Sequence, residues 1–536
     1  MPESKKKQLA RLKEHAHKIK QETIDFFNVE RFFHLTDKKR FHQVISDRTF
    51  QDLDMEEVFM FIDRTVSKVG QQFLYHTLRT IPDDTLRTER FEKKVKIFKD
   101  KPELKDAVLL ELGTLQSTNA YYIVSLFLRE HIQKPGWFWI IPLLSLASVS
   151  SVLLLFVFPQ AFIALVVLLA VNFGFHYWNK NNLYQYANSI PQLSRMTWAA
   201  KKISELEGMG DDHPEIRKSI AAIESLGVPM SIFRLEAKLQ SEIGLLVEHI
   251  LELIKALFLI EPLALYHVLN QLDKKRTEIQ EIYTYIGETD VAMSISFLRD
   301  ELPSFCIPSI DKNKKRLTAV DIYHPLIYQS VANSIDITGK SALLTGSNMS
   351  GKTTFIRTIG INAILAQTIN TCFAREFRIP MLKVNSAIRI SDDLLNEKSY
   401  YFEEVLAVKA LLEESRSGFQ NLFLLDEMFK GTNTVERVAS GKAVLEYLTK
   451  HDNLVFAATH DLQLADLLTD TFKTFHFTET VESDQLIFDY KIKTGVLTDT
   501  NAIRILELNL YPSEVTDEAK QLATRMFNNK VTRNQL

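Results

Sequence analysis

Cysteine is scarce in this chain. Its 536 residues include two cysteines, Cys306 and Cys372, which lie far apart in the sequence and lack the short spacing of metal ligands. This scarcity excludes a disulfide-rich secreted scaffold and argues against a cysteine zinc site. We expect both side chains to be reduced thiols in the core of a cytosolic domain. The length also predicts more than one domain.

The chain also lacks a strong net charge. Its 64 Lys and Arg residues nearly balance 67 Asp and Glu residues, for a net charge of −3. No global field attracts nucleic acid, so contact with DNA requires a local basic patch. One such patch lies in a predicted helical segment, residues 1–47, and no apolar run follows it as in a signal peptide. Its face could lie on anionic lipid or contact DNA, although a solvated helix face is the favoured interpretation. The basic residues are Lys5, Lys6, Lys7, Arg11, Lys13, Lys18 and Lys20.

Charged residues are absent from Trp137 to Trp178. Residues 137–158 are long enough to cross the ~30 Å hydrocarbon core of a bilayer as a helix. Pro159 and Gln160 then break the run, and residues 161–178 supply a second, slightly shorter span. We predict a two-helix transmembrane hairpin at residues 136–179. The alternative is a buried helical hairpin in a large soluble core.

The ends of this hairpin carry the residues that are typical of a membrane boundary. Lys134 precedes the hairpin and Lys180 follows it, so both flanks are predicted to be cytoplasmic. The chain is then an integral protein of a bacterial-type inner membrane, with both termini in the cytoplasm. Aromatic residues, which are common at the interface, lie at the outer ends: Trp137, Trp139, Tyr177 and Trp178.

A later apolar stretch, Leu245–Leu269, has a different pattern. Glu248, Glu252, Lys255 and Glu261 interrupt it. Because charged residues recur within the stretch, a packed soluble helix is the favoured interpretation.

A glycine-containing motif of the G-x-x-x-x-G-K-[ST] type lies at residues 345–354. It follows an apolar run, Ala342–Leu344, that reads as a buried strand, and a helical pattern begins at Phe355. Strand, loop and helix form the context of a phosphate-binding loop, in which backbone N–H groups point at phosphate oxygens. Lys352 would reach the β- and γ-phosphates of ATP, and the Thr353 hydroxyl would bind Mg²⁺. The predicted nucleotide-binding residues are Gly346, Ser347, Asn348, Met349, Ser350, Gly351, Lys352, Thr353 and Thr354.

Two further apolar runs end in polar residues. Asn421–Leu425 precedes Asp426 and Glu427, and Leu454–Ala458 precedes His460. Asp426 is placed to hold Mg²⁺, and Glu427 is placed to orient or deprotonate the attacking water. His460 would lie beside the γ-phosphate. The predicted catalytic residues are therefore Lys352, Glu427 and His460.

Together these segments resemble the ATPase domain of the MutS family, the family of DNA mismatch repair proteins. The resemblance includes the phosphate loop, the Asp426–Thr434 segment (DEMFKGTNT) and Ala458-Thr459-His460. It extends over about residues 48–135 and 190–520. Further matching segments are Ser391–Leu394 with Ser399–Glu404, the tail Tyr490–Val496, and Asp52–Asp54 with Asp63–Gly70.

This resemblance implies an ABC-type P-loop ATPase, with ATP and Mg²⁺ as ligands, that forms a homodimer through this domain. Ser399 would contact the γ-phosphate bound by the partner chain, and Asn348 would help to hold the phosphates. Nucleotide binding and dimer closure would then be one linked equilibrium.

The chain departs from the family pattern in three respects. Phe429-Lys430-Gly431 replaces the usual Gly-Arg-Gly, which keeps the charge without the guanidinium fork. Residues 330–333 lack the aromatic residue that often stacks on adenine, so the adenine contact is unassigned. About 45 residues precede the core, too few for a mismatch-reading and a connector domain, so specific mismatch recognition is not expected.

The sequence therefore predicts five parts. An α/β ABC-type ATPase domain follows an all-α MutS-like core that a membrane hairpin interrupts. The parts are a basic helical segment (1–47), core helices (48–135), the hairpin (136–179), a helical lever (180–304) and the ATPase domain (305–536).

Two functions remain open at this point. The first is a membrane-anchored MutS-like ATPase that couples ATP hydrolysis to DNA binding in repair or recombination. The second is a membrane mechanochemical or scaffold ATPase that acts on a protein or lipid partner without DNA.

Overall fold

The chain forms two compact units, each of which we describe by itself. A computed structural model describes residues 4–20, 23–128, 136–226, 245–311, 315–347, 350–389, 400–482, 485–497 and 502–533. The helical unit comprises residues 1–41 and 59–302, and the α/β unit comprises residues 42–58 and 303–536. The division between residues 58 and 59 falls inside helix α5 (Met55–Ile62).

The helical unit is organised around α16 (Arg276–Glu301), most of whose length is buried. It packs against α6 (Lys68–Arg79) and α7 (Leu86–Asp100). Gly70 of α6 lies so close to the Asp290 side chain of α16 that no side chain would fit there. The other described elements of this unit are α1 (Lys5–Ala16), α2 (Phe26–Val29), α3 (Arg31–Leu35), β2 (Thr80–Ile81), α8 (Pro102–Leu112), η1 (Gly113–Leu115), η2 (Thr118–Val124), α9 (Ser125–Leu128), α10 (Ile140–Leu154), α11 (Ala161–Ser204), α12 (Ile216–Glu224), α14 (Leu245–Phe258), α15 (Ile260–Leu272) and η3 (Asp273–Lys275).

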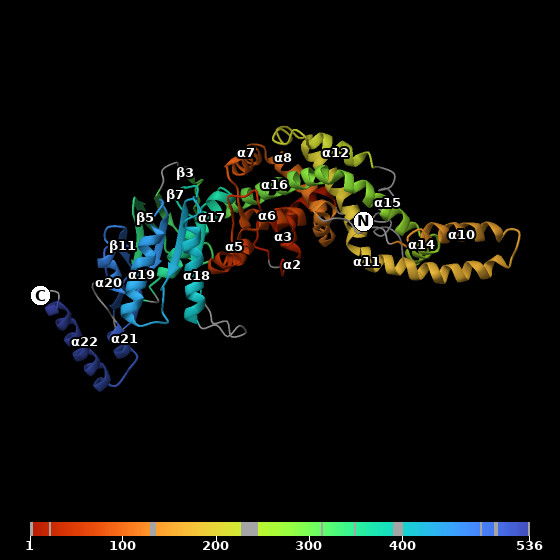
Figure 1. Ribbon diagram of the computed structural model, residues 1–536. Helices are drawn as coiled ribbons and strands as arrows, with labels where there is room; N and C mark the ends of the chain where they lie inside the picture. Colours follow the sequence, from red (N-terminus) through yellow and green to blue (C-terminus); the bar gives the residue numbers. More distant parts are fainter. Residues whose placement is uncertain are drawn as a thin grey trace. The chain divides into compact units, whose positions relative to one another are not determined.

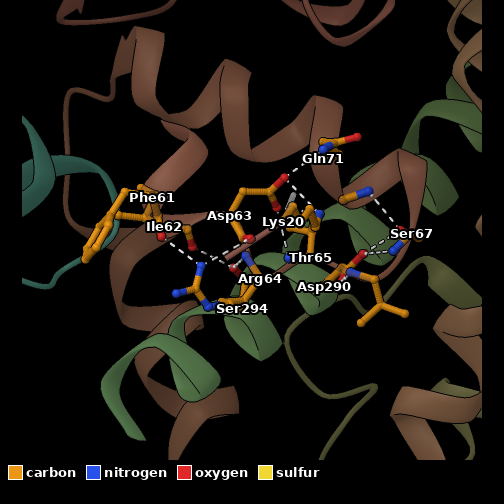
Figure 2. A network of polar contacts seen from close by, with 12 residues as sticks. Lys20, Phe61, Ile62, Asp63, Arg64, Thr65, Ser67, Gln71, Asp290 and Ser294 are labelled. Carbon is orange, nitrogen blue, oxygen red and sulfur yellow. Dashed lines mark hydrogen bonds and ion pairs between the residues drawn. The ribbon is translucent and has the colours of Figure 1, made fainter. Parts of the chain in front are cut away.

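A buried polar network fixes the entry into α6 (Figure 2). Asp290 accepts hydrogen bonds from the backbone N–H groups of Val66 and Ser67, at 3.0 and 2.7 Å. The Ser67 hydroxyl also accepts from Gly70 N, and so caps the first turn of the helix. Asp63 accepts from Lys20 Nζ at 2.8 Å. The residues that resemble the start of the MutS core therefore serve this packing.

The N-terminal basic segment is only partly available to an external partner. Helix α1 buries Leu12 and Ala16, and Lys13 forms an ion pair with Asp106. The Lys20 side chain is 8% exposed and paired with the buried Asp63 carboxylate. Burying a charge is unfavourable unless it is paired, so Lys20 belongs to the core of the unit and not to a solvated face.

Helices α10 and α11 form a hairpin that carries the uncharged segment (Figure 1). Helix α10 has 15 residues, fewer than the predicted span of 137–158, and is about 22 Å long at 1.5 Å per residue. Helix α11 begins at Ala161 as expected but continues unbroken to Ser204, past the predicted end at residue 178. By length and composition, Ala161–Trp178 is the one stretch among the described residues that could cross a membrane.

The outer surface of this hairpin is apolar. Large hydrophobic side chains that are normally buried project from it, and 11% of the Ala161–Trp178 stretch is buried. The low burial of this stretch differs from that of a core helix in a soluble protein, which is mostly buried. The exposed residues are Trp139, Leu143, Leu146, Val149, Leu153, Leu154, Phe156, Val157, Phe158, Phe162, Ile163, Val166, Val167, Val171, Phe173, Tyr177 and Trp178.

The α/β unit is built on a six-stranded sheet of order β14-β11-β6-β10-β9-β8. The strands from β11 to β8 are parallel, and β14 is antiparallel to β11. This confirms the α/β class that the alternation of apolar runs and helices predicts. The strands are β6 (Ser341–Thr345), β8 (Lys383–Ala387), β9 (Asn421–Asp426), β10 (Leu454–Ala458), β11 (Phe472–His476) and β14 (Lys493–Thr494).

Helices pack against the strands of this sheet through alternating side chains. Phe423 and Leu425 of β9 pack in one cluster with Ala407 of α18 and Leu445 of α19. Gly360 of α17 lies against Leu424, the residue between them, without room for a side chain. Because successive strand residues point to opposite faces, α17 packs on the face opposite to α18 and α19. The helices of this unit are α4 (Asp47–Asp52), α17 (Lys352–Thr368), α18 (Tyr400–Glu414), α19 (Thr434–Leu448), α20 (Leu462–Leu467), α21 (Ala502–Leu508) and α22 (Ser513–Arg533).

Residues 42–58 are part of this unit, although the sequence alone groups 48–58 with the core helices. The buried Asp52 carboxylate accepts hydrogen bonds from Ser386 Oγ at 2.6 Å and Arg389 N at 2.9 Å. Asp54 forms an ion pair with Arg357 of α17 at 3.0 Å. The remaining strands are β1 (Gln43–Val44), the β12–β13 hairpin (Glu479–Glu482 and Gln485–Phe488), and a sheet of order β3-β7-β4-β5 (Ser309–Asp311, Glu376–Pro380, Arg316–Ile322 and Asn333–Thr338).

The two cysteines meet in this unit. Cys306 and Cys372 form an antiparallel bridge in which each backbone N–H donates to the other carbonyl at 3.0 Å. Both are free thiols, as expected, and Cys372 is buried while Cys306 is partly exposed.

Candidate functional site

The phosphate-loop motif adopts a tight turn between β6 and α17. Gly346 has φ of 136° and Gly351 has φ of 105°, a region that side chains other than glycine rarely adopt. A side chain at Gly346 would also collide with the Phe477 carbonyl oxygen. The turn directs the N-terminus of a 17-residue helix toward the loop, and free N–H groups at such an end attract anions.

Lys352 begins α17, and its ammonium group points back into the loop. It donates to the carbonyl oxygens of Gly346 and Ser347 at 2.7 and 2.6 Å. Burial lowers the pKa of Lys352, while the nearby carboxylates of Glu427 and Asp426 act in the opposite direction. The cation is therefore held at the loop without a direct ion pair among the described residues, which leaves its charge for an anion.

The next residue, Thr353, joins α17 to the end of β9. Its hydroxyl donates to Asp426 Oδ2 at 2.5 Å. The other oxygen, Asp426 Oδ1, is buried and has no hydrogen-bond partner among the described residues. Burial raises the pKa of Asp426, and the Thr353 hydrogen bond partly opposes this rise. An unpartnered buried carboxylate oxygen beside a hydroxyl fits a hard divalent cation, because Mg²⁺ prefers oxygen ligands.

Protein side chains alone do not complete such a site. No cluster of three or more His, Cys, Asp or Glu residues suited to a metal occurs in the described part of the chain. This agrees with Mg²⁺, which commonly binds one or two carboxylates and takes its other ligands from phosphate and water.

Glu427 lies directly after β9 with φ of 48°. One carboxylate oxygen contacts His460 Nε2, and the other accepts from Lys430 Nζ at 2.6 Å. Burial would raise the pKa of Glu427, but the hydrogen bonds from His460 and Lys430 outweigh burial and bring the pKa to about 2. The structure thus brings the predicted catalytic residues Glu427 and His460 together, and it gives Lys430 the role of a second partner.

Two contacts outside the predicted site hold these loops in place. Arg437 of α19 donates to both oxygens of Asp461, each at 2.8 Å, next to His460. Glu404 of α18 accepts a hydrogen bond from Phe429 N, within the segment that follows Glu427. A bidentate pair fixes both position and orientation, so these contacts determine where His460 and Lys430 lie.

A pocket of about 480 Å³ adjoins the start of α17. Gly351, Thr353 and Thr354 form its phosphate-loop wall, and Tyr328 and Tyr490 are among the aromatic residues that line it. The sequence leaves the adenine contact unassigned because no aromatic residue occurs at 330–333. Tyr490, which the sequence shows only as part of a closing strand, is an aromatic residue that the structure places in this pocket.

Asn333 holds the Tyr490 segment at the pocket. Its side-chain amide donates to Tyr490 O at 2.9 Å and accepts from Ile492 N at 2.9 Å. Tyr490 itself has φ of 50°, and its ring stacks on Phe488 with centroids 5.8 Å apart.

The structure places the other described residues of the predicted loop as follows. Ser347 donates to Glu479 Oε2 at 2.9 Å, and the Ser350 hydroxyl donates to Ser347 O at 2.7 Å. Asn348, Met349 and Ser399 lie outside the described residues, and so do Ser391–Leu394. Their predicted roles stay predictions.

Comparison with known proteins bears on this unit. Residues 342–527 match the protein family MutS domain V. That range contains the whole phosphate loop as well as Asp426, Glu427, His460 and Tyr490. The α/β unit therefore contains a segment that matches MutS domain V. The finding agrees with the resemblance that the motifs carry.

Relatives named DNA mismatch repair protein MutS are similar to part of this chain. The protein of Petrotoga mobilis is 29% identical over 276 residues, which are 49% of this chain and 33% of the relative. That of Thermus thermophilus is 30% identical over 207 residues, 38% of this chain and 25% of the relative. That of Lactobacillus acidophilus is 28% identical over 271 residues, 48% of this chain and 31% of the relative. The chain thus covers between a quarter and a third of the length of these relatives.

Proposed function

We propose that this protein is a membrane-anchored ATPase of the MutS type. The observation that carries the proposal is the convergence of Lys352, Thr353, Asp426, Glu427 and His460 at the carboxyl edge of one parallel sheet. Each supplies a chemical group that phosphoryl transfer requires: a cation, a hydroxyl, two carboxylates and an imidazole.

The residues divide into binding and reacting groups. The backbone of the loop and Lys352 bind the β- and γ-phosphates, and Tyr490 stacks on the adenine in the adjoining pocket. Thr353 and Asp426 would hold Mg²⁺, which when bound would neutralise charge on the phosphates. ATP then occupies both the loop and the pocket.

Glu427 orients the attacking water in this scheme. With a pKa of about 2, it is ionised at neutral pH and is a weak base. It therefore acts by accepting a hydrogen bond from the water, more than by removing its proton before attack. His460 and Lys430 hold the carboxylate in position, and His460 is the group that reaches from β10 toward the γ-phosphate.

The dimer is part of the proposal. Ser399 would complete the site of the partner chain in a homodimer formed through the α/β unit. Mixing a Ser399→Ala chain with a Lys352→Ala chain tests this geometry, because half of the sites in a mixed dimer keep both groups. Recovery of hydrolysis on mixing is expected, and no recovery would count against a site shared between chains.

The α10–α11 hairpin is the membrane anchor in this proposal. It has an uncharged 42-residue sequence and an apolar surface with aromatic residues at its outer ends. Lipid acyl chains would cover that surface, with both termini and the α/β unit in the cytoplasm.

DNA is the first candidate for the partner on which ATP hydrolysis acts, since the relatives are named as mismatch repair proteins. A protein or lipid partner at the membrane is the second candidate. The internal ion pairs of Lys13 and Lys20 favour the second, because they reduce the basic surface available to phosphates.

One experiment separates these cases. ATP hydrolysis by the protein in nanodiscs would be measured with and without duplex, mismatched and branched DNA at two salt concentrations, with Lys352→Ala as the inactive control. Salt-sensitive stimulation by DNA supports the first function. Hydrolysis that no DNA changes supports the second, and absence of hydrolysis with and without every DNA contradicts the proposed ATPase.

A further inference from the structure

Helices α14 and α15 meet in a sharp elbow next to the hairpin. A single residue, Leu259, joins them, with φ of 49° and a fully buried side chain. Helix α14 packs against both α10 and α11, on the part of the hairpin away from its Leu155–Gln160 turn (Figure 1). The segment from Ala256 to Ile260 carries no charge.

The polar side chains of the hairpin are directed at the end of α14. Ser145 of α10 donates to Phe258 O at 2.7 Å, and Asn172 of α11 donates to Leu257 O at 2.6 Å. Asn172 also donates to Ser148 Oγ at 2.9 Å. The last carbonyl groups of a helix have no partner within the helix. Water would satisfy them at an exposed end, so side-chain partners are needed where water is absent.

Ser145 and Asn172, which cap the end of α14, lie at the same depth along the hairpin, as two independent distances show. Six residues separate Ser145 from Trp139 along α10, and six separate Asn172 from Trp178 along α11. At 1.5 Å per residue, each cap lies about 9 Å from the aromatic residue on its own helix, toward the hairpin turn. If those aromatic residues mark the membrane interface, the end of α14 lies about 9 Å inside it.

The charges near the elbow fit this placement. His176, two residues from Trp178, contacts Glu252 at 3.2 Å and Glu261 at 3.9 Å. Lys255 pairs with Glu252 at 3.6 Å. The ionisable groups are thus paired with one another, as such groups are inside membranes.

Helix α14 also carries exposed apolar side chains: Leu253 is 48% exposed and Ile254 is 42% exposed. Val149 and Val171 of the hairpin are exposed as well.

We propose that the α14–α15 elbow enters the membrane as a re-entrant element, with lipid acyl chains against Leu253 and Ile254. In this proposal the elbow does not cross the bilayer. The chain enters along α14, turns at Leu259 and leaves along α15. Non-helical backbone at membrane depth is tolerated only when its polar groups are satisfied by protein. Ser145 and Asn172 provide that satisfaction, and Ser148 accepts a hydrogen bond that holds Asn172. This inference rests on the proposed insertion of the hairpin, and it replaces the soluble helix that the sequence favours at Leu245–Leu269.

The test is the position of a fluorescent probe in nanodiscs. Ile254→Cys would be labelled with an environment-sensitive dye in a Cys306→Ser background. Quenching would be compared between lipids that carry a nitroxide near the headgroup end of the acyl chain and iodide in the water. Val166→Cys on α11, 51% exposed, is the control for the hairpin, and Val435→Cys on α19, 79% exposed, is the control for the aqueous phase.

The expected result is lipid quenching at positions 254 and 166 with protection from iodide, and the reverse at position 435. Lipid quenching at 166 with iodide quenching at 254 overturns the elbow and leaves the anchor standing. Protection of 254 from both quenchers also overturns it, because a protein partner then covers the surface. Iodide quenching at both 166 and 254 overturns the anchor and the elbow together.

A second variant tests the caps. Asn172→Leu removes the donor to Leu257 O, so the probe at position 254 should lose lipid quenching and become accessible to iodide. Val171→Leu, at a neighbouring exposed position, is the matched control and should leave the probe unchanged. An unchanged probe in Asn172→Leu would show that the carbonyl needs no protein partner, and it would overturn the proposed depth.

Discussion

Thr353 donates its hydroxyl hydrogen to Asp426, with the two oxygens 2.5 Å apart, and so links the first turn of α17 to the end of β9. The bond holds in place the two side chains that fit Mg²⁺. The second Asp426 oxygen stays buried without a partner in the described structure. The Asp426 carboxylate and the helix that follows the phosphate loop are therefore linked through one hydroxyl.

Removal of this hydroxyl should weaken the use of Mg²⁺. We expect Thr353→Ala to lower ATP hydrolysis at limiting Mg²⁺ by about 100-fold, since a bound metal contributes several kcal/mol to such reactions. Thr353→Ser keeps the hydroxyl and should stay close to the wild type. The measurement is the Mg²⁺ dependence of hydrolysis. An unchanged half-saturating Mg²⁺ concentration in Thr353→Ala would contradict the assignment.

Glu427 should be required for hydrolysis but not for nucleotide binding. We expect Glu427→Gln to lower the hydrolysis rate by about 10² to 10⁴-fold, the usual contribution of a positioned acid–base group. ATP affinity, measured by titration with a fluorescent analogue, should remain within a few-fold of the wild type. Equal hydrolysis by the two proteins would remove Glu427 from the mechanism.

The pH dependence of hydrolysis tests the partner of Glu427. Its pKa of about 2 means that the carboxylate stays ionised from pH 4 to pH 8 in the wild type. Lys430→Met removes one of the hydrogen bonds that lower this pKa, so the pKa should rise and protonation should reduce the rate at the acidic end. The rate–pH profiles of the two proteins from pH 4 to pH 8 provide the measurement. Superimposable profiles would show that Lys430 does not control the ionisation of Glu427.

The phosphate loop and the parallel sheet could be predicted from sequence because their signals are local. Glycine spacing, an apolar strand and a following helix lie within about 30 consecutive residues, and the structure places Lys352, Thr353, Asp426 and Glu427 together. The wall of the pocket beside the phosphate loop could not be predicted in the same way. Asn333 reaches Tyr490 across 157 positions of sequence, and no local pattern shows such a contact.

The burial of individual lysines in the N-terminal segment could not be predicted from the charge pattern either. A series of lysines in a helix is typical of a solvated face, but Lys20 is buried against Asp63. Whether a given lysine finds a buried partner depends on the tertiary fold, which the pattern does not contain. Likewise, nothing in the sequence near residue 178 stops a helix, and α11 continues to Ser204.

Asp290 should make the stability of the helical unit depend on pH. Burial raises its pKa from 3.8 to about 6, despite the hydrogen bonds from Ser67 and Val66 (Figure 2). Between pH 4 and 6, the folded unit then holds a proton that the unfolded chain releases. Binding of this proton stabilises the folded unit at pH 4, and the stabilisation is lost as the pH rises through 6. The free energy of unfolding then falls by about 3 kcal/mol.

Asp290→Asn cannot ionise and should lack this loss. Its stability relative to the wild type, from denaturant unfolding in detergent, should therefore rise between pH 4 and 6 and level off above pH 7. The comparison cancels the contributions of other titrating groups. A constant difference over this pH range would show that the pKa of Asp290 is not raised.

The cysteine bridge should close to a disulfide under oxidation. Residues that exchange two backbone hydrogen bonds in an antiparallel pair have Cα atoms about 5.5 Å apart, within the range that a disulfide spans. A hydrogen bond with the Cys372 side chain lowers the pKa of Cys306, which favours the reactive thiolate at the more exposed of the two sulfurs.

The oxidant in this experiment is oxidised glutathione. The Cys306 thiolate attacks one of its sulfurs and releases one reduced glutathione, and Cys372 then displaces the second. The two protein thiols lose two protons and two electrons, so the intact mass should fall by two hydrogens, and peptide mapping should join residues 306 and 372. Cys306→Ser, the control, should keep its mass, because Cys372 is buried. A wild-type protein that stops at the mixed disulfide would show that the two sulfurs cannot approach each other within the folded unit.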